Sequence, residues 1–170
     1  MNIGQKKSLG FSLLEMLIVL ALVSLTLYLS FGQLRFLKRG YACAELDSLY
    51  QTCLYMQRHA MVTGKTCDIT LNLVDNSYQF NNQQCQLAQG IQFDVLPYVK
   101  GPPSTPTKLL SKPCSFKNNH ISFSKDGSMS AGAVYITDVA HNCLYALSSS
   151  VSSYSYLRKY RYAGKWHQLD

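Results

Sequence analysis

Residues 10–34 read GFSLLEMLIVLALVSLTLYLSFGQL, and this stretch decides the fold of the N-terminal part of the chain. Residues 16–34 contain no charged side chain. About 20 such residues are enough for a helix to cross the hydrocarbon core of a bilayer. The apolar block is longer than the core of a secretory signal, and no small-residue cleavage site follows it. We therefore expect a membrane helix that is retained in the mature chain.

Glu15 places a negative charge at the start of this apolar block, directly after Leu13 and Leu14. An unpaired carboxylate in hydrocarbon is costly, so an acid within a membrane segment indicates a functional role. The alternative is that Glu15 lies at the level of the lipid headgroups, where its cost is small. Depth alone does not decide between these two interpretations.

The leader, the glycine and the acid together form a recognisable motif. Lys6, Lys7 and Gly10 precede Phe11 and Glu15, and the long apolar helix follows. This arrangement resembles the class III signal of type IV pilins and type II secretion pseudopilins. The resemblance implies cleavage after Gly10 by a prepilin peptidase, N-methylation of Phe11, and pairing of Glu15 with the N-terminal amine of a neighbouring filament subunit. Such pairing would remove most of the cost of burying either charge.

The helical pattern continues beyond the apolar block. Apolar residues recur at helical spacing as a single stripe, which consists of Ala42, Leu46, Leu49, Cys53, Met56 and Ala60. Gly64 then provides a typical helix stop. The expected organisation is a leader peptide (1–10), a transmembrane and assembly helix (11–34), an amphipathic continuation of that helix (35–63) and a β-rich globular head (64–170).

After the helix, short β-rich runs alternate with turn residues, which is typical of antiparallel strands. A loop over residues 97–119 holds all five prolines. The predicted strands are residues 67–74, 77–80, 91–96, 120–124, 133–137, 143–149 and 154–162. The predicted fold class is α+β, a pilin fold in which a long N-terminal helix packs on an antiparallel sheet.

The six cysteines are candidates for disulfides outside the cytoplasm, because none belongs to a CxxC pair. They are Cys43, Cys53, Cys67, Cys85, Cys114 and Cys143. On one helix, Cys43 and Cys53 would lie about 15 Å apart, beyond the roughly 7 Å between Cα atoms that a disulfide allows. The other pairings stay open, as does the alternative that some thiols are simply buried apolar groups.

The net charge of +7 favours anionic partners, although Lys6 and Lys7 of the leader contribute to it. The C-terminal run YSYLRKYRYAGKWHQ alternates aromatic and basic side chains. Its candidate DNA contacts are Arg158, Lys159, Arg161 and Lys165, because cations bind phosphates and aromatic rings stack on unpaired bases. In a strand, Arg158 would share one face with the tyrosines, and Lys159 and Arg161 would share the other. A half-buried strand shows the same alternation.

No motif for catalysis, for a metal or for a cofactor stands out. The four histidines are scattered and belong to no local catalytic phrase. His141 and Cys143 lack the second spaced pair of a zinc site. Asp126 and Asp138 lack the oxygen-rich loop of a calcium site. We therefore expect a binding protein without a cofactor, and not an enzyme.

The phrases LYMQRHAMVTGKTCDITL and ISFSKDGSMSAGAVYITD resemble the GspH/FimT-type minor pseudopilins. That resemblance implies a subunit of a type II secretion pseudopilus, with a single-pass inner-membrane helix and a periplasmic head, that contributes to filament tip assembly and protein export. Its partners would be other pilins or pseudopilins, the prepilin peptidase, the inner membrane and secreted cargo. The alternative is a minor pilin of a type IV pilus or DNA-uptake filament that binds DNA through the basic C-terminal strand.

Overall fold

The structure is a computed structural model that describes residues 12–103, 106–150 and 156–169, with the side chains of all of these except residues 30–39. No helix within this described part is both long enough and apolar enough to cross a membrane. The predicted membrane segment, residues 16–34, extends into the residues whose side chains are not described. The membrane helix therefore stays a prediction.

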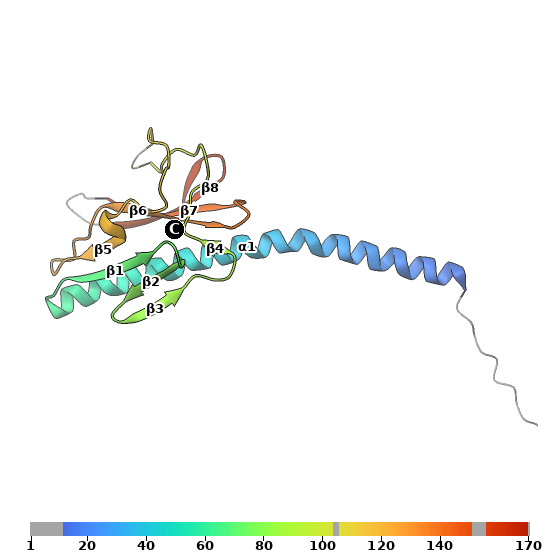
Figure 1. Ribbon diagram of the computed structural model, residues 1–170, viewed down its shortest axis with the longest axis horizontal. Helices are drawn as coiled ribbons and strands as arrows, with labels where there is room; N and C mark the ends of the chain where they lie inside the picture. Colours follow the sequence, from blue (N-terminus) through green and yellow to red (C-terminus); the bar gives the residue numbers. More distant parts are fainter. Residues whose placement is uncertain (1–11, 104–105, 151–155, 170) are drawn as a thin grey trace, which may run out of the picture. The chain divides into compact units, whose positions relative to one another are not determined.

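The chain divides into two compact units, Met1–Phe36 and Leu37–Asp170. The helix α1, Leu13–Thr63, begins in the first unit and ends in the second. The strands β1 to β9 all lie in the second unit, which we call the head (Figure 1). The helix ends where Gly64 adopts a left-handed conformation with φ of 66°. Glycine adopts this conformation without the steric penalty of a Cβ atom, so it is a common residue after a helix.

The strands of the head form two antiparallel sheets. Sheet A has the order β3-β2-β1-β5 and sheet B has the order β4-β6-β7-β8-β9. The strands of sheet A are β1 (Cys67–Asn72), β2 (Ser77–Phe80), β3 (Gln83–Gln86) and β5 (His120–Phe123). The strands of sheet B are β4 (Ile91–Gln92), β6 (Gly132–Asp138), β7 (Leu144–Ser150), β8 (Tyr156–Tyr162) and β9 (Trp166–Leu169). A short 3-10 helix, η1 (Lys117–Asn119), precedes β5.

The apolar stripe of α1 is the centre of the main core. Each of its members is at most 1% exposed, namely Ala42, Leu46, Leu49, Cys53, Met56 and Ala60. The same cluster contains Ile69 and Leu71 of sheet A and Val134 and Leu147 of sheet B. Both sheets therefore bury side chains against this part of the helix, which confirms the predicted α+β architecture.

A second apolar cluster lies on the opposite, outer face of sheet B. Ala133 and Tyr135 of β6, and Ala146 of β7, alternate with the residues that face the helix. Residues of the long loop, such as Val99 and Leu110, cover these side chains. Sheet B is therefore a middle layer, with the helix on one face and the loop on the other.

The structure corrects the prediction at β4 and adds two strands outside the predicted ranges, β3 and β9. The predicted strand 91–96 is reduced to Ile91–Gln92. The chain leaves the sheet near Asp94, whose carboxylate accepts a hydrogen bond from the backbone N–H of Val95 at 2.8 Å. Strand β3 has the sequence QQCQ, which carries no apolar alternation, yet it pairs with β2 along its length.

Truncation of the central stripe should destabilise the head strongly. Leu49→Ala is expected to lower the free energy of unfolding by about 2–5 kcal/mol, because it leaves a cavity in a fully buried site. Val62→Ala is the matched control, since Val62 is 86% exposed, and it should change the free energy by less than about 0.5 kcal/mol. Urea unfolding in detergent, followed by the fluorescence of the single tryptophan, Trp166, measures both. Equal effects of the two variants would contradict the assigned burial.

Candidate functional site

The first turn of α1 holds Glu15 in a capped helix start. The backbone N–H of Glu15 donates to the carbonyl oxygen of Ser12 at 3.0 Å and to its Oγ at 3.3 Å. Met16 donates its N–H to the same carbonyl oxygen at 3.2 Å. Ser12 therefore acts as the N-cap, and the spacing of Ser12 and Glu15 is that of a capping box. This spacing is a signal in the sequence that could have predicted the role of Ser12.

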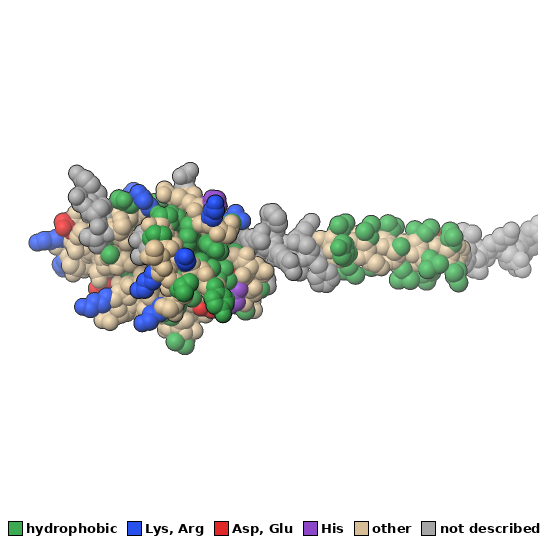
Figure 2. All heavy atoms as spheres, turned by 90° about the horizontal axis from the view of Figure 1, so that it is seen from above, with side chains coloured by type: hydrophobic (Ala, Val, Ile, Leu, Met, Phe, Trp, Pro, Cys, Tyr) green, Lys and Arg blue, Asp and Glu red, His purple; other side chains and the backbone are tan. Residues whose placement is uncertain are grey.

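The helix surface that follows is apolar all round. The large hydrophobic side chains of residues 13–29 are between 48% exposed, at Val23, and 79% exposed, at Leu13 and Tyr28. Figure 2 shows hydrophobic side chains along this segment. Exposed apolar surface of this extent is typical of a protein or membrane interface. This part of the helix requires cover that the chain itself does not provide among its described residues.

The hydroxyl groups within this apolar segment are satisfied by the helix backbone. Ser24 Oγ donates to the carbonyl oxygen of Leu20 at 2.6 Å, and Thr26 Oγ1 donates to that of Val23 at 2.8 Å. Such bonds hide the polar groups of serine and threonine from an apolar environment. The carboxylate of Glu15 remains as the one charged group in residues 12–29. The other predicted members of this site, Gly10 and Phe11, lie outside the described residues.

The predicted DNA contacts lie on different faces of the head. Strand β8 pairs with β7 in a register that separates Arg158 from Lys159 and Arg161, as the alternation predicted. Lys159 faces the helix, where its Nζ lies 2.8 Å from Asp47 Oδ1 and 5.1 Å from the centre of the Tyr50 ring. The hydrogen bond to Asp47 raises the pKa of Lys159. Lys159 therefore contributes to the contact between helix and sheet.

Arg158 and Lys165 lie on the outer side of sheet B. The guanidinium of Arg158 lies 4.4 Å from the centre of the Tyr156 ring. Lys165 lines a cavity together with Tyr162 and Trp166. The structure therefore does not bring Arg158, Lys159, Arg161 and Lys165 together as one cationic surface.

None of the six cysteines, all of which the structure describes, forms a disulfide, so no predicted disulfide is brought together. Cys53 is fully buried in the stripe of α1, and burial raises its pKa to about 12. Burial also raises the pKa of Cys114. Cys67 lies 3.4 Å from the imidazole of His59 through its Sγ atom. Cys53 and Cys114 are therefore protonated, buried thiols at neutral pH.

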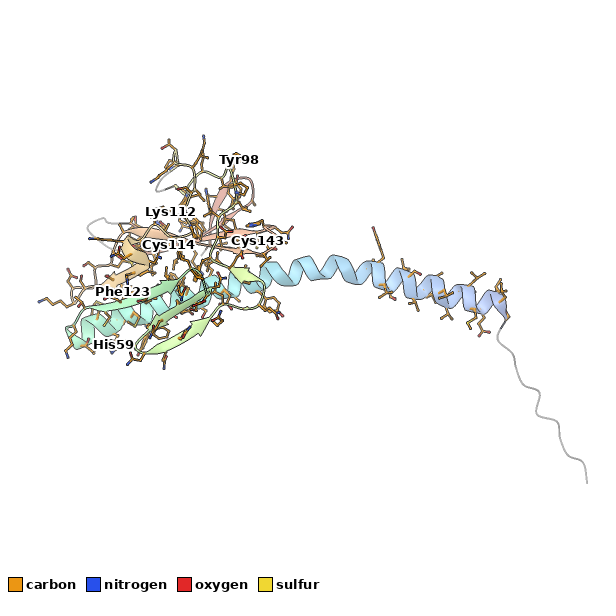
Figure 3. All side chains as sticks on the ribbon, in the orientation of Figure 1. His59, Tyr98, Lys112, Cys114, Phe123 and Cys143 are labelled. Carbon is orange, nitrogen blue, oxygen red and sulfur yellow. The ribbon has the colours of Figure 1, made fainter. Side chains whose placement is uncertain are left out.

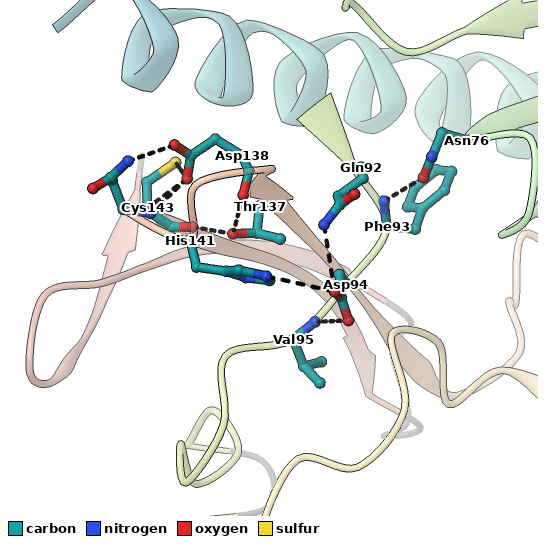
Figure 4. Close-up of polar contacts among 10 residues, drawn as sticks. Asn76, Gln92, Phe93, Asp94, Val95, Thr137, Asp138, His141 and Cys143 are labelled. Carbon is teal, nitrogen blue, oxygen red and sulfur yellow. Dashed lines mark hydrogen bonds and ion pairs between the residues drawn. The ribbon is translucent and has the colours of Figure 1, made fainter. Parts of the chain in front are cut away.

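The turn between β6 and β7 is closed by a buried carboxylate (Figure 4). Asp138 Oδ1 accepts the backbone N–H groups of Asn142 at 2.7 Å and of Cys143 at 3.1 Å. Desolvation by burial raises the pKa of Asp138, but the hydrogen bonds from Asn142 and Cys143 outweigh it, so the net pKa is lowered. His141 lies 3.9 Å from Asp94 on the other side of the turn. In the described part of the chain, no group of three or more His, Cys, Asp or Glu side chains could hold a metal ion.

The comparison with protein families identifies the N-terminal motif. The model of the prokaryotic N-terminal methylation motif matches residues 5–27, a range that includes Gly10, Phe11, Ser12 and Glu15. The chain is type IV pilin-like. The motif carries this conclusion, and the long helix packed on antiparallel sheets agrees with it.

Two other comparisons of this pilin-like chain concern curated proteins and solved structures. None of the curated proteins matches it. The minor pseudopilin EpsH from the type 2 secretion system of Vibrio cholerae is similar in structure, with a TM-score of 0.49 and 15% sequence identity. That similarity covers 69% of this chain and 94% of the EpsH chain.

Protonation of Asp138 should weaken the head in acid. A lowered folded pKa means that this carboxylate stabilises the head above its unfolded pKa, near 3.8, and that the contribution is lost as the pH falls through the folded value. Asp138→Asn should therefore lower the melting temperature at pH 7 and flatten its dependence on pH below about 4. The control is Asp68→Asn, which neutralises an exposed carboxylate. Thermal unfolding of each variant from pH 7 to pH 3 tests this, and parallel curves for Asp138→Asn and the parent would refute it.

Proposed function

We propose that this chain is a filament subunit that assembles through Glu15 and the N-terminal amine of the neighbouring subunit. A prepilin peptidase would cut after Gly10 and methylate the new amine on Phe11. The observation that carries the proposal is the methylation motif over residues 5–27, which ends in a helix whose apolar side chains are exposed. An ammonium group from the next subunit would compensate the carboxylate in a low-dielectric environment.

The burial of neighbouring apolar helices against one another would then supply most of the association energy. Each square ångström of apolar surface removed from water contributes roughly 25 cal/mol. The pairing of Glu15 with an amine would contribute register more than affinity, because a buried polar pair disfavours every alignment that leaves it unpaired. This division of roles is consistent with a single charge in an otherwise uncharged segment.

At a finer level, we propose a minor pseudopilin of the GspH/FimT type in a type II secretion pseudopilus. The helix would cross the inner membrane once and the head would lie in the periplasm. The subunit would act by binding and would catalyse no reaction. The support for this level is the pattern of the head sequence, in particular the phrases at the end of α1 and through β5 and β6.

A DNA-uptake minor pilin is the second candidate. It is favoured by Arg158 and Lys165, which are exposed on the outer side of sheet B. It is disfavoured by the use of Lys159 in an ion pair with Asp47. A gel-shift experiment with the protein in detergent, at several salt concentrations, separates the two candidates, because DNA affinity from phosphate contacts falls steeply with salt.

Neutralisation of Glu15 should weaken assembly without affecting cleavage. Glu15→Gln is expected to reduce incorporation into sheared filaments by at least about tenfold, which corresponds to about 1.4 kcal/mol of lost pairing. Cleavage between Gly10 and Phe11 should continue, since Glu15 is not part of the scissile bond. Immunoblots of sheared filaments and mass spectrometry of the N-terminus, after co-expression with a prepilin peptidase, give the two readouts.

The matched control is again Asp68→Asn, which removes a carboxylate from the surface of the head and should leave incorporation unchanged. Normal incorporation of Glu15→Gln would overturn the pairing mechanism. An uncut Gly10–Phe11 bond in the parent protein would overturn the assignment as a filament subunit.

A further inference from the structure

Cavities follow the outer side of sheet B, where the long loop covers it. A cavity of about 800 Å³ lies between residues 108–119 and strands β6 and β7. Another, of about 620 Å³, lies between the loop and the turn from β8 to β9, and a smaller one of about 160 Å³ lies beside Arg158. In Figure 3, Tyr98 lies on the projecting part of the loop and Lys112 lies closer to the sheet. We call the residues that line these cavities the outer cavity face.

Every charged side chain of the outer cavity face is basic. These side chains are Lys100, Lys108, Lys112, Arg158 and Lys165. All are exposed, and none forms an ion pair with a residue that the structure describes. The helix-facing side of sheet B differs, because Asp47 neutralises Lys159 there. Uncompensated positive charge around cavities attracts an anionic partner.

The rim of this face is held in a fixed conformation. Gly101 donates its N–H to the carbonyl oxygen of Lys108 at 2.9 Å, and the indole N–H of Trp166 donates to that of Lys100 at 2.8 Å. Tyr98 has φ of 63° and is 91% exposed. A left-handed conformation at a bulky residue costs roughly 1–3 kcal/mol, and such strain clusters at binding sites. A rim that is ordered in advance loses little entropy when a partner binds.

The cavity of about 800 Å³ is lined by uncharged polar side chains as well as by lysines. Asn118, Asn119 and Ser150 line it. Amide and hydroxyl groups both donate and accept hydrogen bonds, so they match the N–H and C=O groups of a peptide backbone.

Apart from Tyr98, whose ring is exposed, the aromatic rings of this face already contact other side chains, which favours a peptide over unpaired bases. The ring of Trp166 already contacts those of Tyr162 at 5.2 Å, Tyr135 at 6.2 Å and Tyr160 at 6.4 Å between centroids. The ring of Tyr156 is covered by the guanidinium of Arg158 at 4.4 Å. Base stacking needs ring faces that are free to receive successive bases. The engaged rings instead provide an apolar wall against which an aliphatic side chain fits.

We propose that the outer cavity face binds an acidic, extended segment of a partner protein. Its carboxylates lie beside Lys100, Lys165 and Lys108, and an aliphatic side chain contacts Tyr98 and the wall formed around Trp166. The charge of the face selects an acidic partner. The engaged rings, together with the amide and hydroxyl groups of Asn118, Asn119 and Ser150, select a polypeptide. This binding concerns the head alone and does not depend on assembly through Glu15.

Fluorescence anisotropy with the full chain in detergent micelles tests the proposal. The probes are a fluorescein-labelled peptide rich in glutamate and leucine, the same peptide with glutamine for glutamate, and a labelled oligothymidylate. The acidic peptide should bind best of the three, and less tightly as salt is added. The double variant Lys100→Glu/Lys165→Glu should weaken its binding at least about tenfold. Tyr98→Ala should weaken it several-fold with an unchanged dependence on salt.

The matched control is Lys65→Glu/Lys125→Glu, which reverses two exposed charges outside the outer cavity face. It keeps the net charge of the test variant, so a similar loss of binding in both would show non-specific attraction and overturn the proposal. Equal binding of the glutamine peptide, or the lack of any acidic-peptide binding, would also overturn it. Tighter binding of the oligothymidylate would assign the face to nucleic acid instead. Unchanged thermal unfolding of all variants confirms that the substitutions leave the head folded.

Discussion

The burial of one apolar stripe of α1 between two sheets is the constraint on which the head depends. Leu46, Leu49 and Met56 are covered by side chains from both sheets, so neither sheet has a complete core without the helix. The same helix carries, over residues 13–29, apolar side chains that nothing in the described chain covers. One element thus combines an internal core with an external apolar surface. Exposed apolar surface of this extent is typical of an interface with another molecule.

The sequence predicted those features that rest on local periodicity. The helical spacing of the stripe predicted the buried face of α1. The alternation in YSYLRKYRY predicted that Arg158 and Lys159 face opposite sides of a sheet. Features that rest on distant partners were not predictable. Strand β3 has no apolar alternation and forms because β2 offers its edge, and Lys159 meets a residue 112 positions away in the chain. The cap at Ser12 was predictable from its spacing to Glu15. The closure of the β6–β7 turn by Asp138 was not predictable, because no sequence pattern indicates it.

The two sides of sheet B differ in how their charges are compensated. On the helix side, Asp47 lies against Lys159, and the cation thereby becomes part of the fold. On the loop side, Arg158 and the lysines have no carboxylate beside them among the described residues. The alternation of a single strand places neighbouring cations in these two settings. Lys159 is therefore part of the fold, whereas Arg158 and Lys165 on the outer side are exposed and available to a partner.

The start of α1 shows how an acid can occupy the first turn of a helix while its carboxylate stays available for another contact. In a full capping box, the glutamate carboxylate returns to the N–H of the capping residue. Here the Oγ and carbonyl oxygen of Ser12 already accept the N–H of Glu15, and the carboxylate of Glu15 makes no hydrogen bond with a described residue. The negative charge is still favourable at this position because of the helix dipole, which contributes about 0.3–1 kcal/mol. Since the carboxylate of Glu15 takes no part in the cap, a neighbouring amine can bind it while the hydrogen bonds of the first turn stay intact.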